Sequence, residues 1–211
     1  MREDFPPVYV ILDAPLLAGP AEEITEQLAE SGVALLQYRD KFSGARKTFH
    51  ICKRLVITLR PWNVRLIVND RADIAALAGA AGTHVGQDDL DLEAARLMCP
   101  PPMWVGVSTH NLQQLAQAAV TSADYIAFGP IFSTQTKANS DPVVGLDLLH
   151  QARRLTSKPL VAIGGITAEN AAEVFSAGAD CVAVVRDVLA AADPAARVRE
   201  FLRAAASARG K

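Results

Sequence analysis

The chain has 211 residues, half of them apolar and about a fifth charged, which is the composition of a globular protein with one sizeable core. A formal net charge of −2 leaves no basic excess, so a nucleic-acid-binding surface is not expected. No apolar run approaches the ~20 residues of a membrane-spanning helix, and the opening MREDFPPVYV does not resemble a signal peptide.

Short runs rich in β-branched residues recur along the chain and predict eight strands. They lie at residues 8–13, 33–39, 65–70, 82–86, 104–109, 125–130, 159–165 and 181–187. Several of these runs are apolar throughout, as is typical of strands in a parallel sheet that is covered on both faces. The segments between them show helical periodicity, for example at Leu112, Leu115, Ala116 and Ala119.

The tail also predicts a helix, with Asp193 as its cap, Pro194 in its first turn and an apolar face that includes Val198 and Phe201. Eight strand–helix units in succession predict a single α/β domain over residues 1–211, a (β/α)8 TIM barrel. These units average ~26 residues, which is short for this fold. A doubly wound open sheet is therefore the alternative architecture.

In a (β/α)8 barrel the active site lies at the carboxyl ends of the strands. Polar residues follow the predicted strands at 37–41, 69–71, 86–89, 108–110, 128–140, 164–167 and 186–187. Because these segments meet at one rim of the barrel, their cations, carboxylates, hydroxyls and glycines predict a site there.

Three cations on this rim, Arg39, Lys41 and Lys137, are suited to bind anionic oxygens. Asp70 follows one strand, and Asp88 and Asp89 follow the next. Carboxylates beside a cationic phosphate pocket predict Mg²⁺, which binds through one or two carboxylates together with substrate phosphates and water. The alternative is that Asp70 pairs with its neighbour Arg71 and that Asp89 caps the next helix.

The run GGIT at 164–167 predicts a second anion site, since glycines allow close backbone approach and the amides of a helix N-terminus favour anions. Thr167 has a helix cap as its other possible role. Two anion positions fit two phosphorylated substrates or one long one. His84 is expected to be a core residue and His110 to face the site; no serine–histidine–acid set is evident from spacing.

At the strand ends the sequence resembles the thiamine-phosphate synthase family. The matching motifs are QYRDK, LIVNDRADIA, GTHVGQDDL, VGVSTH, DYIAFGPIFSTQTK, AIGGIT and GADCVAVV, which occur in order between residues 33 and 187. The ordered set is more specific than any single motif. The resemblance implies a (β/α)8 barrel that joins a pyrimidine methyl diphosphate to a thiazole phosphate, giving thiamine phosphate and diphosphate.

The resemblance also implies a role for individual residues. It assigns the pyrimidine diphosphate to Gln37, Arg39, Lys41, Asn69, Ser108 and Lys137, Mg²⁺ to Asp70 and Asp89, and the thiazole phosphate to Thr134, Thr136, Gly165, Val185 and Arg186. Catalysis is then expected to be electrostatic, with Arg39, Lys41 and Lys137 stabilising the departing diphosphate. Arg186 is a departure, because the family often has serine there.

Two other functions are compatible with the same barrel. A thiazole tautomerase would act on the thiazole phosphate alone, with His110 as an acid or base, and would not need the metal and diphosphate residues. A non-catalytic ligand-binding relative is the third possibility. The expected partners are two small phosphorylated substrates, with the oligomeric state left open. Three widely spaced cysteines predict reduced thiols and a cytoplasmic protein.

Overall fold

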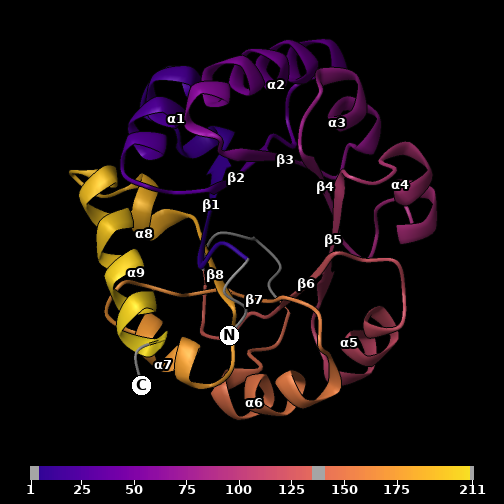
Figure 1. The fold of residues 1–211 in the computed structure, drawn as a ribbon, viewed down its shortest axis with the longest axis vertical. Coiled ribbons are helices and arrows are strands. Elements are labelled where there is room, and N and C mark those ends of the chain that lie inside the picture. Colours follow the sequence, from indigo (N-terminus) through magenta and orange to yellow (C-terminus); the bar gives the residue numbers. More distant parts are fainter. Residues whose placement is uncertain (1–4, 135–140, 210–211) are drawn as a thin grey trace.

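The computed structural model describes residues 5–134 and 141–209. Eight parallel strands form a closed barrel in sequential order, because β1 pairs with both β2 and β8 (Figure 1). The strands are β1 (Val8–Asp13), β2 (Leu35–Arg39), β3 (Arg65–Asn69), β4 (Gly82–Val85), β5 (Trp104–Thr109), β6 (Tyr125–Phe128), β7 (Leu160–Ile163) and β8 (Cys181–Val184). The predicted barrel is therefore confirmed, and the open sheet is excluded.

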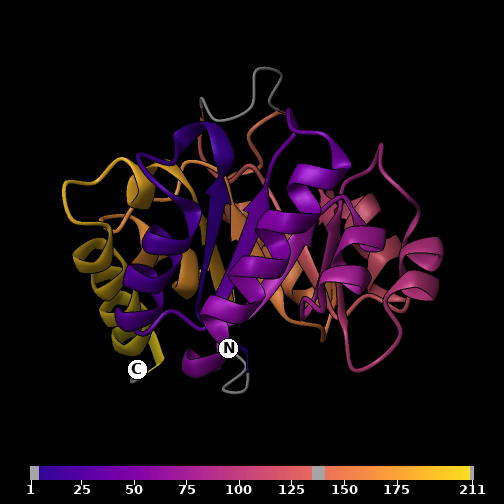
Figure 2. The same ribbon diagram turned by 90° about the horizontal axis from the view of Figure 1, so that it is seen from above.

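Helices surround the barrel (Figure 1) and cover the outer faces of the strands, as the view turned by 90° also shows (Figure 2). They are α1 (Ala21–Glu30), α2 (Ala45–Leu59), α3 (Ala72–Ala78), α4 (Leu92–Met98), α5 (Leu112–Ala119), α6 (Gly145–Leu155), α7 (Ala171–Ser176), α8 (Arg186–Leu189) and α9 (Pro194–Arg209); the short 3-10 turns are η1 (Ala14–Leu16) and η2 (Arg60–Trp62). Among the described residues, no helix is long and apolar enough to cross a bilayer.

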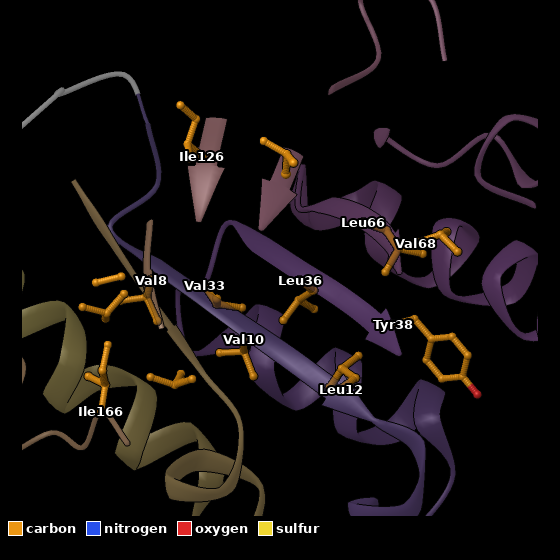
Figure 3. Packing of buried hydrophobic residues seen from close by; sticks show 14 of the residues in the cluster. Val8, Val10, Leu12, Val33, Leu36, Tyr38, Leu66, Val68, Ile126 and Ile166 are labelled. Atoms are coloured by element: carbon orange, nitrogen blue, oxygen red, sulfur yellow. The ribbon is translucent and has the colours of Figure 1, made fainter. Parts of the chain in front are cut away.

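The alternation of side chains along each strand divides the core into two layers. Val8, Val10 and Leu12 of β1 point outward and pack with residues of β2 and β3 in the layer beneath the helices (Figure 3). Tyr9 and Ile11 of the same strand point into the barrel. Burying a side chain such as Leu12 stabilises the folded state by about 1.5–3 kcal/mol. Apolar residues are therefore favoured on both faces of the strand, which appears in the sequence as a continuous apolar run.

Three predicted details differ from the structure. The buried face of α5 is formed by Leu115 and Ala118, whereas the predicted Ala116 is exposed. β8 ends at Val184, and Arg186 begins α8 instead of ending the strand. Thr167 does not cap α7, whose N-cap is Asn170. The cap of α9 is confirmed, since the Asp193 carboxylate accepts the Ala196 N–H at 2.8 Å.

Two arginine–aspartate pairs tie the amino ends of the strands together. Asp180, which precedes β8, is 1% exposed; its Oδ2 accepts a hydrogen bond from Arg153 at 2.6 Å and from the Leu160 N–H of β7 at 2.9 Å. Asp124, which precedes β6, accepts hydrogen bonds from Arg96 and from the Val105 N–H of β5 in the same manner. Removing Arg153 would leave the buried Asp180 carboxylate unpaired, which typically costs about 3–5 kcal/mol. These contacts therefore hold the end of the barrel opposite the predicted site.

Candidate active site

Two cavities adjoin at the carboxyl ends of the strands. The larger encloses about 520 Å³ and lies at the ends of β1, β2 and β5 to β8. The smaller encloses about 110 Å³ and includes the ends of β2, β3 and β4. Both are lined by Ile11, Arg39, Ser108, Ile163 and Ala183. The site thus has two compartments with a common wall, which suits two ligands that must meet.

The smaller compartment contains the predicted metal carboxylates. Lys41 forms an ion pair with Asp70, and its Nζ lies 3.8 Å from Asp89 Oδ1. Asp89 also accepts the Gly86 N–H at 2.8 Å, whereas Asp88 is exposed and does not line the cavity. The structure therefore brings Lys41, Asp70 and Asp89 together, and it favours Asp89 over Asp88.

The alternative roles of the two carboxylates do not match the structure. Arg71 pairs with Asp73, with Nη2 and Oδ2 2.6 Å apart, and not with Asp70. The cap of α4 is Asp91, which accepts the Ala94 N–H at 2.8 Å. Asp70 and Asp89 therefore have neither of these alternative roles, and both line the smaller cavity.

Asp70 and Asp89 interact strongly enough to shift each other's protonation. Burial raises the pKa of Asp70, and the neighbouring Asp89 raises it further. Burial acts in the same direction on Asp89, but hydrogen bonds from Asp70 and the Gly86 N–H, together with Lys41, lower its pKa. A divalent cation bound between the two carboxylates would favour the ionised form of both.

These residues fit Mg²⁺ as an incomplete set of ligands. Within the described part of the chain, no group of three or more His, Cys, Asp or Glu side chains is placed to hold a metal ion. Mg²⁺ commonly uses one or two protein carboxylates and takes its other ligands from phosphates and water. Asp70 and Asp89 therefore match a cation that arrives with a phosphorylated ligand.

Arg39 is fixed at the boundary of the two compartments by a residue that the sequence did not single out. Asp13, at the end of β1, is 5% exposed and accepts a hydrogen bond from Arg39 Nη1 at 2.5 Å. The pairing register places Asp13 directly opposite Arg39. Since Arg39 lines both cavities, this ion pair aims its guanidinium at the place where two ligands would meet.

The remaining residues predicted for the pyrimidine diphosphate also lie at this site. Gln37 and Asn69 line the smaller cavity, and Ser108 lines both cavities. Gln37 donates a hydrogen bond to the Tyr9 hydroxyl at 2.7 Å, so part of its amide is engaged within the barrel. Lys137 falls outside the described residues.

The larger compartment brings together Thr134, Gly165, Val185 and Arg186, four of the residues predicted for the thiazole phosphate. The fifth, Thr136, lies outside the described residues. Gly165 adopts a φ of +63°, and a Cβ there would lie 2.5 Å from the Ser133 carbonyl oxygen. Glycine is therefore required at Gly165, and its backbone borders the cavity without a side chain in the way.

We expect Gly165→Ala to raise the KM for the thiazole phosphate at least about tenfold and to destabilise the fold by about 1–3 kcal/mol, the usual cost of a strained backbone position. Steady-state kinetics and thermal unfolding measure the two effects. Gly19→Ala is the control, because a Cβ at Gly19 would have no other atom within 4 Å. An unchanged KM in Gly165→Ala would remove this glycine from the binding site.

Arg186 opens the short helix α8 and lines the larger cavity. The two carboxylates that follow it most closely in the sequence, Asp187 and Asp193, are engaged elsewhere. Asp187 accepts the Ala168 N–H at 3.2 Å and lies 3.7 Å from Arg197, and Asp193 caps α9. Within the described residues, Arg186 thus lines the cavity and pairs with neither Asp187 nor Asp193.

Two histidines take different positions. His110 lines the larger cavity, as predicted, and its Nδ1 lies 2.8 Å from the Gly129 carbonyl oxygen and 3.4 Å from Asp141. His84 is 7% exposed, as predicted for a core residue, and it also borders the smaller cavity. Its Nε2 lies 2.9 Å from the Ser108 hydroxyl, a spatial pair that the separation of 24 residues concealed.

The closed barrel and the polar compartments at the carboxyl ends of its strands define a (β/α)8-barrel enzyme. Residues 8–188 match the family model described as thiamine monophosphate synthase. The chain therefore belongs to the thiamine-phosphate synthase family, as the motifs predicted.

Individual relatives agree with this assignment. A thiamine-phosphate synthase of Koribacter versatilis (strain Ellin345) is 51% identical over 203 residues, which are 93% of this chain and 94% of the relative. The solved thiamine phosphate pyrophosphorylase from Pyrococcus furiosus superposes with a TM-score of 0.87 at 31% identity and covers 96% of both chains. A 3-hexulose-6-phosphate synthase, at 22% identity and a TM-score of 0.70 over 94% of this chain and 99% of its own, shares the fold alone.

Proposed function

We propose that this chain joins 4-amino-2-methyl-5-(diphosphooxymethyl)pyrimidine to 4-methyl-5-(2-phosphooxyethyl)thiazole and releases diphosphate, with Mg²⁺ as its cofactor. The observation that carries the proposal is the pair of adjoining compartments, one with the Lys41, Asp70 and Asp89 cluster and one beside Gly165 and Arg186. The first suits a diphosphate with its cation, and the second suits a phosphate monoester.

In this mechanism the protein acts by electrostatics. Negative charge grows on the diphosphate as its bond to the pyrimidine methylene breaks, and Arg39, Lys41 and Lys137 stabilise it. Mg²⁺, when bound by Asp70 and Asp89, would add to the neutralisation of that charge. Asp13 holds Arg39 in place, so the guanidinium does not need to be reoriented during the reaction.

The second half of the reaction is a matter of positioning. The thiazole nitrogen attacks the electron-deficient methylene carbon of the pyrimidine, and no protein nucleophile takes part. The larger compartment would hold the thiazole by its phosphate, through the Gly165 backbone, Thr134 and Arg186, so that its nitrogen faces the shared wall. Thr136 is proposed to add a neutral donor.

One experiment separates this function from its two alternatives. Both substrates are mixed with Mg²⁺ and the protein, and diphosphate release is followed. Release that requires both substrates supports the synthase. Conversion of the thiazole tautomer without diphosphate release would indicate a tautomerase that uses His110, and binding without turnover would indicate a non-catalytic relative. The Lys41–Asp70–Asp89 cluster favours the first outcome, since a tautomerase has no diphosphate to bind.

We also propose that the protein works in the cytoplasm. Cys52, Cys99 and Cys181 are all buried. Burial raises the pKa of Cys52 and of Cys99, which makes these thiols unreactive. Buried thiols of this kind are typical of a reducing compartment.

Arg186→Ser is expected to raise the KM for the thiazole phosphate roughly ten- to a hundredfold, the equivalent of losing a hydrogen bond between charged groups of about 1.5–3 kcal/mol. The KM for the pyrimidine diphosphate should not change, because Arg186 lines only the larger compartment. Steady-state kinetics with each substrate varied in turn measure both constants.

The matched control is Arg199→Ser on α9, an arginine 3.9 Å from Asp193 that lines neither cavity. If both KM values of Arg186→Ser equal those of the parent, the backbone amides bind the phosphate without help from the guanidinium.

A further inference from the structure

A chain of hydrogen bonds crosses the interior of the barrel and ends at the active site. Gln37 Nε2 donates to the Tyr9 hydroxyl at 2.7 Å, and the Tyr9 and Tyr125 hydroxyls are 3.1 Å apart. The Tyr125 hydroxyl lies 3.1 Å from His84 Nδ1, and His84 Nε2 lies 2.9 Å from Ser108 Oγ. The family resemblance assigns the two ends of this chain, Gln37 and Ser108, to the pyrimidine diphosphate, and both line the smaller cavity. It assigns no role to Tyr9, Tyr125 or His84.

The structure is built to hold this chain in place. Tyr9 and Tyr125 are 1% and 0% exposed, and Tyr9 borders the smaller cavity whereas Tyr125 lines neither cavity. Gly106 of β5 makes room for Tyr125, since a Cβ there would lie 2.1 Å from the tyrosine ring. The His84 and Tyr125 rings stack with centroids 5.4 Å apart, and Phe5 packs on the other side of Tyr125 at 5.6 Å.

The donors in this chain have an order. The Tyr9 oxygen accepts from Gln37, and among the described residues Tyr125 is its other hydrogen-bonding neighbour, so Tyr9 donates to Tyr125. Tyr125 then uses its own proton on His84 Nδ1. The imidazole that accepts at Nδ1 carries its proton on Nε2 and donates it to Ser108. The Ser108 hydroxyl proton is thereby free to point into the cavity.

We propose that His84, Tyr125 and Tyr9 are positioning residues that fix Ser108 as a hydrogen-bond donor toward the diphosphate of the bound ligand. A hydroxyl can donate or accept, and only donation stabilises an anionic oxygen. The buried chain selects the useful orientation before the ligand arrives. The benefit to binding rests on the proposed function, whereas the order of the donors does not.

The same geometry has a rival interpretation. Histidine Nε2 within hydrogen-bonding distance of a serine hydroxyl is also the arrangement of a nucleophilic serine and its base. A base requires an unprotonated Nε2, and therefore a proton on Nδ1. Burial raises the pKa of Tyr125 well above its usual value, so this phenol stays neutral and does not provide the negative charge that an acid partner supplies. The two interpretations thus predict opposite histidine tautomers.

The first test is the tautomer of His84, read by ¹⁵N–¹H NMR of histidine-labelled protein at a pH where the imidazole is neutral. His84→Gln identifies the signal among the four histidines of the chain. We expect a proton on Nε2 and none on Nδ1. A proton on Nδ1, or on both nitrogens, overturns the proposal. This readout needs no activity, so an Nε2 proton in a protein that releases no diphosphate would refute the proposed function and leave the donor order intact.

The second test breaks the chain one step before His84. Tyr125→Phe keeps the ring and removes the hydroxyl, and we expect both His84 tautomers to appear and the KM for the pyrimidine diphosphate to rise roughly three- to tenfold, the equivalent of one neutral hydrogen bond. The kcat should change less. Tyr9→Phe should act in the same direction, and it serves as the second variant if Tyr125→Phe folds poorly.

A double-mutant cycle shows whether the effect passes through Ser108. In a Ser108→Ala background, Tyr125→Phe should cause no further rise in KM, because the group that it positions is gone. An equal rise in both backgrounds would mean that Tyr125 acts through packing and would overturn the proposal. Thr83→Val is the matched control, since Thr83 lies beside His84 on β4 and bonds the Val68 carbonyl on the opposite face of the strand. It should leave the tautomer and the KM unchanged.

Discussion

Asp70→Asn is expected to make activity depend on at least about 10 to 100 times more Mg²⁺, the loss seen when a group that supports a metal is removed. Asparagine keeps the size of the side chain and removes its charge. The backbone should tolerate the change, because Asp70 has a φ of +60° and asparagine accepts this left-handed conformation as readily as aspartate. Titration of activity with Mg²⁺ measures the shift.

Asp73→Asn is the matched control, three residues away in the first turn of α3. Its carboxylate pairs with Arg71 at the surface and lines neither cavity. The Mg²⁺ requirement of this variant should equal that of the parent. Full activity of the parent in excess chelator would remove the metal from the mechanism altogether.

Lys137→Ala is expected to lower kcat about 10²- to 10³-fold, the usual loss when one group that stabilises transition-state charge is removed. Lys137 itself lies outside the described residues. The chain on either side of it borders the active site, since Thr134 and Asp141 both line the larger cavity. Because the negative charge on the diphosphate grows during bond breaking, kcat should fall by more than the KM rises.

Steady-state kinetics of Lys137→Ala test this assignment. Lys47→Ala, which removes an exposed lysine of α2, controls for the loss of one positive charge from the protein. Parent-like kcat and KM values in Lys137→Ala would show that Arg39 and Lys41 stabilise the diphosphate on their own.

The barrel itself could be predicted because its signal is local and repeated. Val8, Val10 and Leu12 face the helices while Tyr9 and Ile11 face the interior, so each strand appears as a short apolar run whatever its neighbours are. The ends of the strands were less predictable. The apolar run of β8 continues past Val184 in sequence, but the chain turns there to begin α8. A helix of four residues is too short to show a helical periodicity in the sequence.

The predicted site residues were found where polar side chains follow a strand, as with Asp70 after β3 and Ser108 near the end of β5. Asp13 carries the same signal, because it ends the apolar strand β1, but its role depends on the register that places it opposite Arg39. The sequence of either strand alone does not reveal that register. His84 and Tyr125 meet from strands 41 residues apart in sequence. A polar residue that points into the barrel from an apolar strand was the available indication of such a contact. The sequence of a single strand does not show which inward-pointing residues of other strands it contacts.

The arginine–aspartate pairs before β6 and β8 bear on how such a protein changes over generations. Both pairs lie at the amino ends of the strands, and they bind main-chain groups, which any substitution in the neighbouring loops leaves available. The cavities lie at the other end, where the loops carry the specificity. Mutations that change ligand specificity therefore leave the contacts at the amino ends of the strands intact. Such a protein can evolve a new specificity while its barrel remains folded.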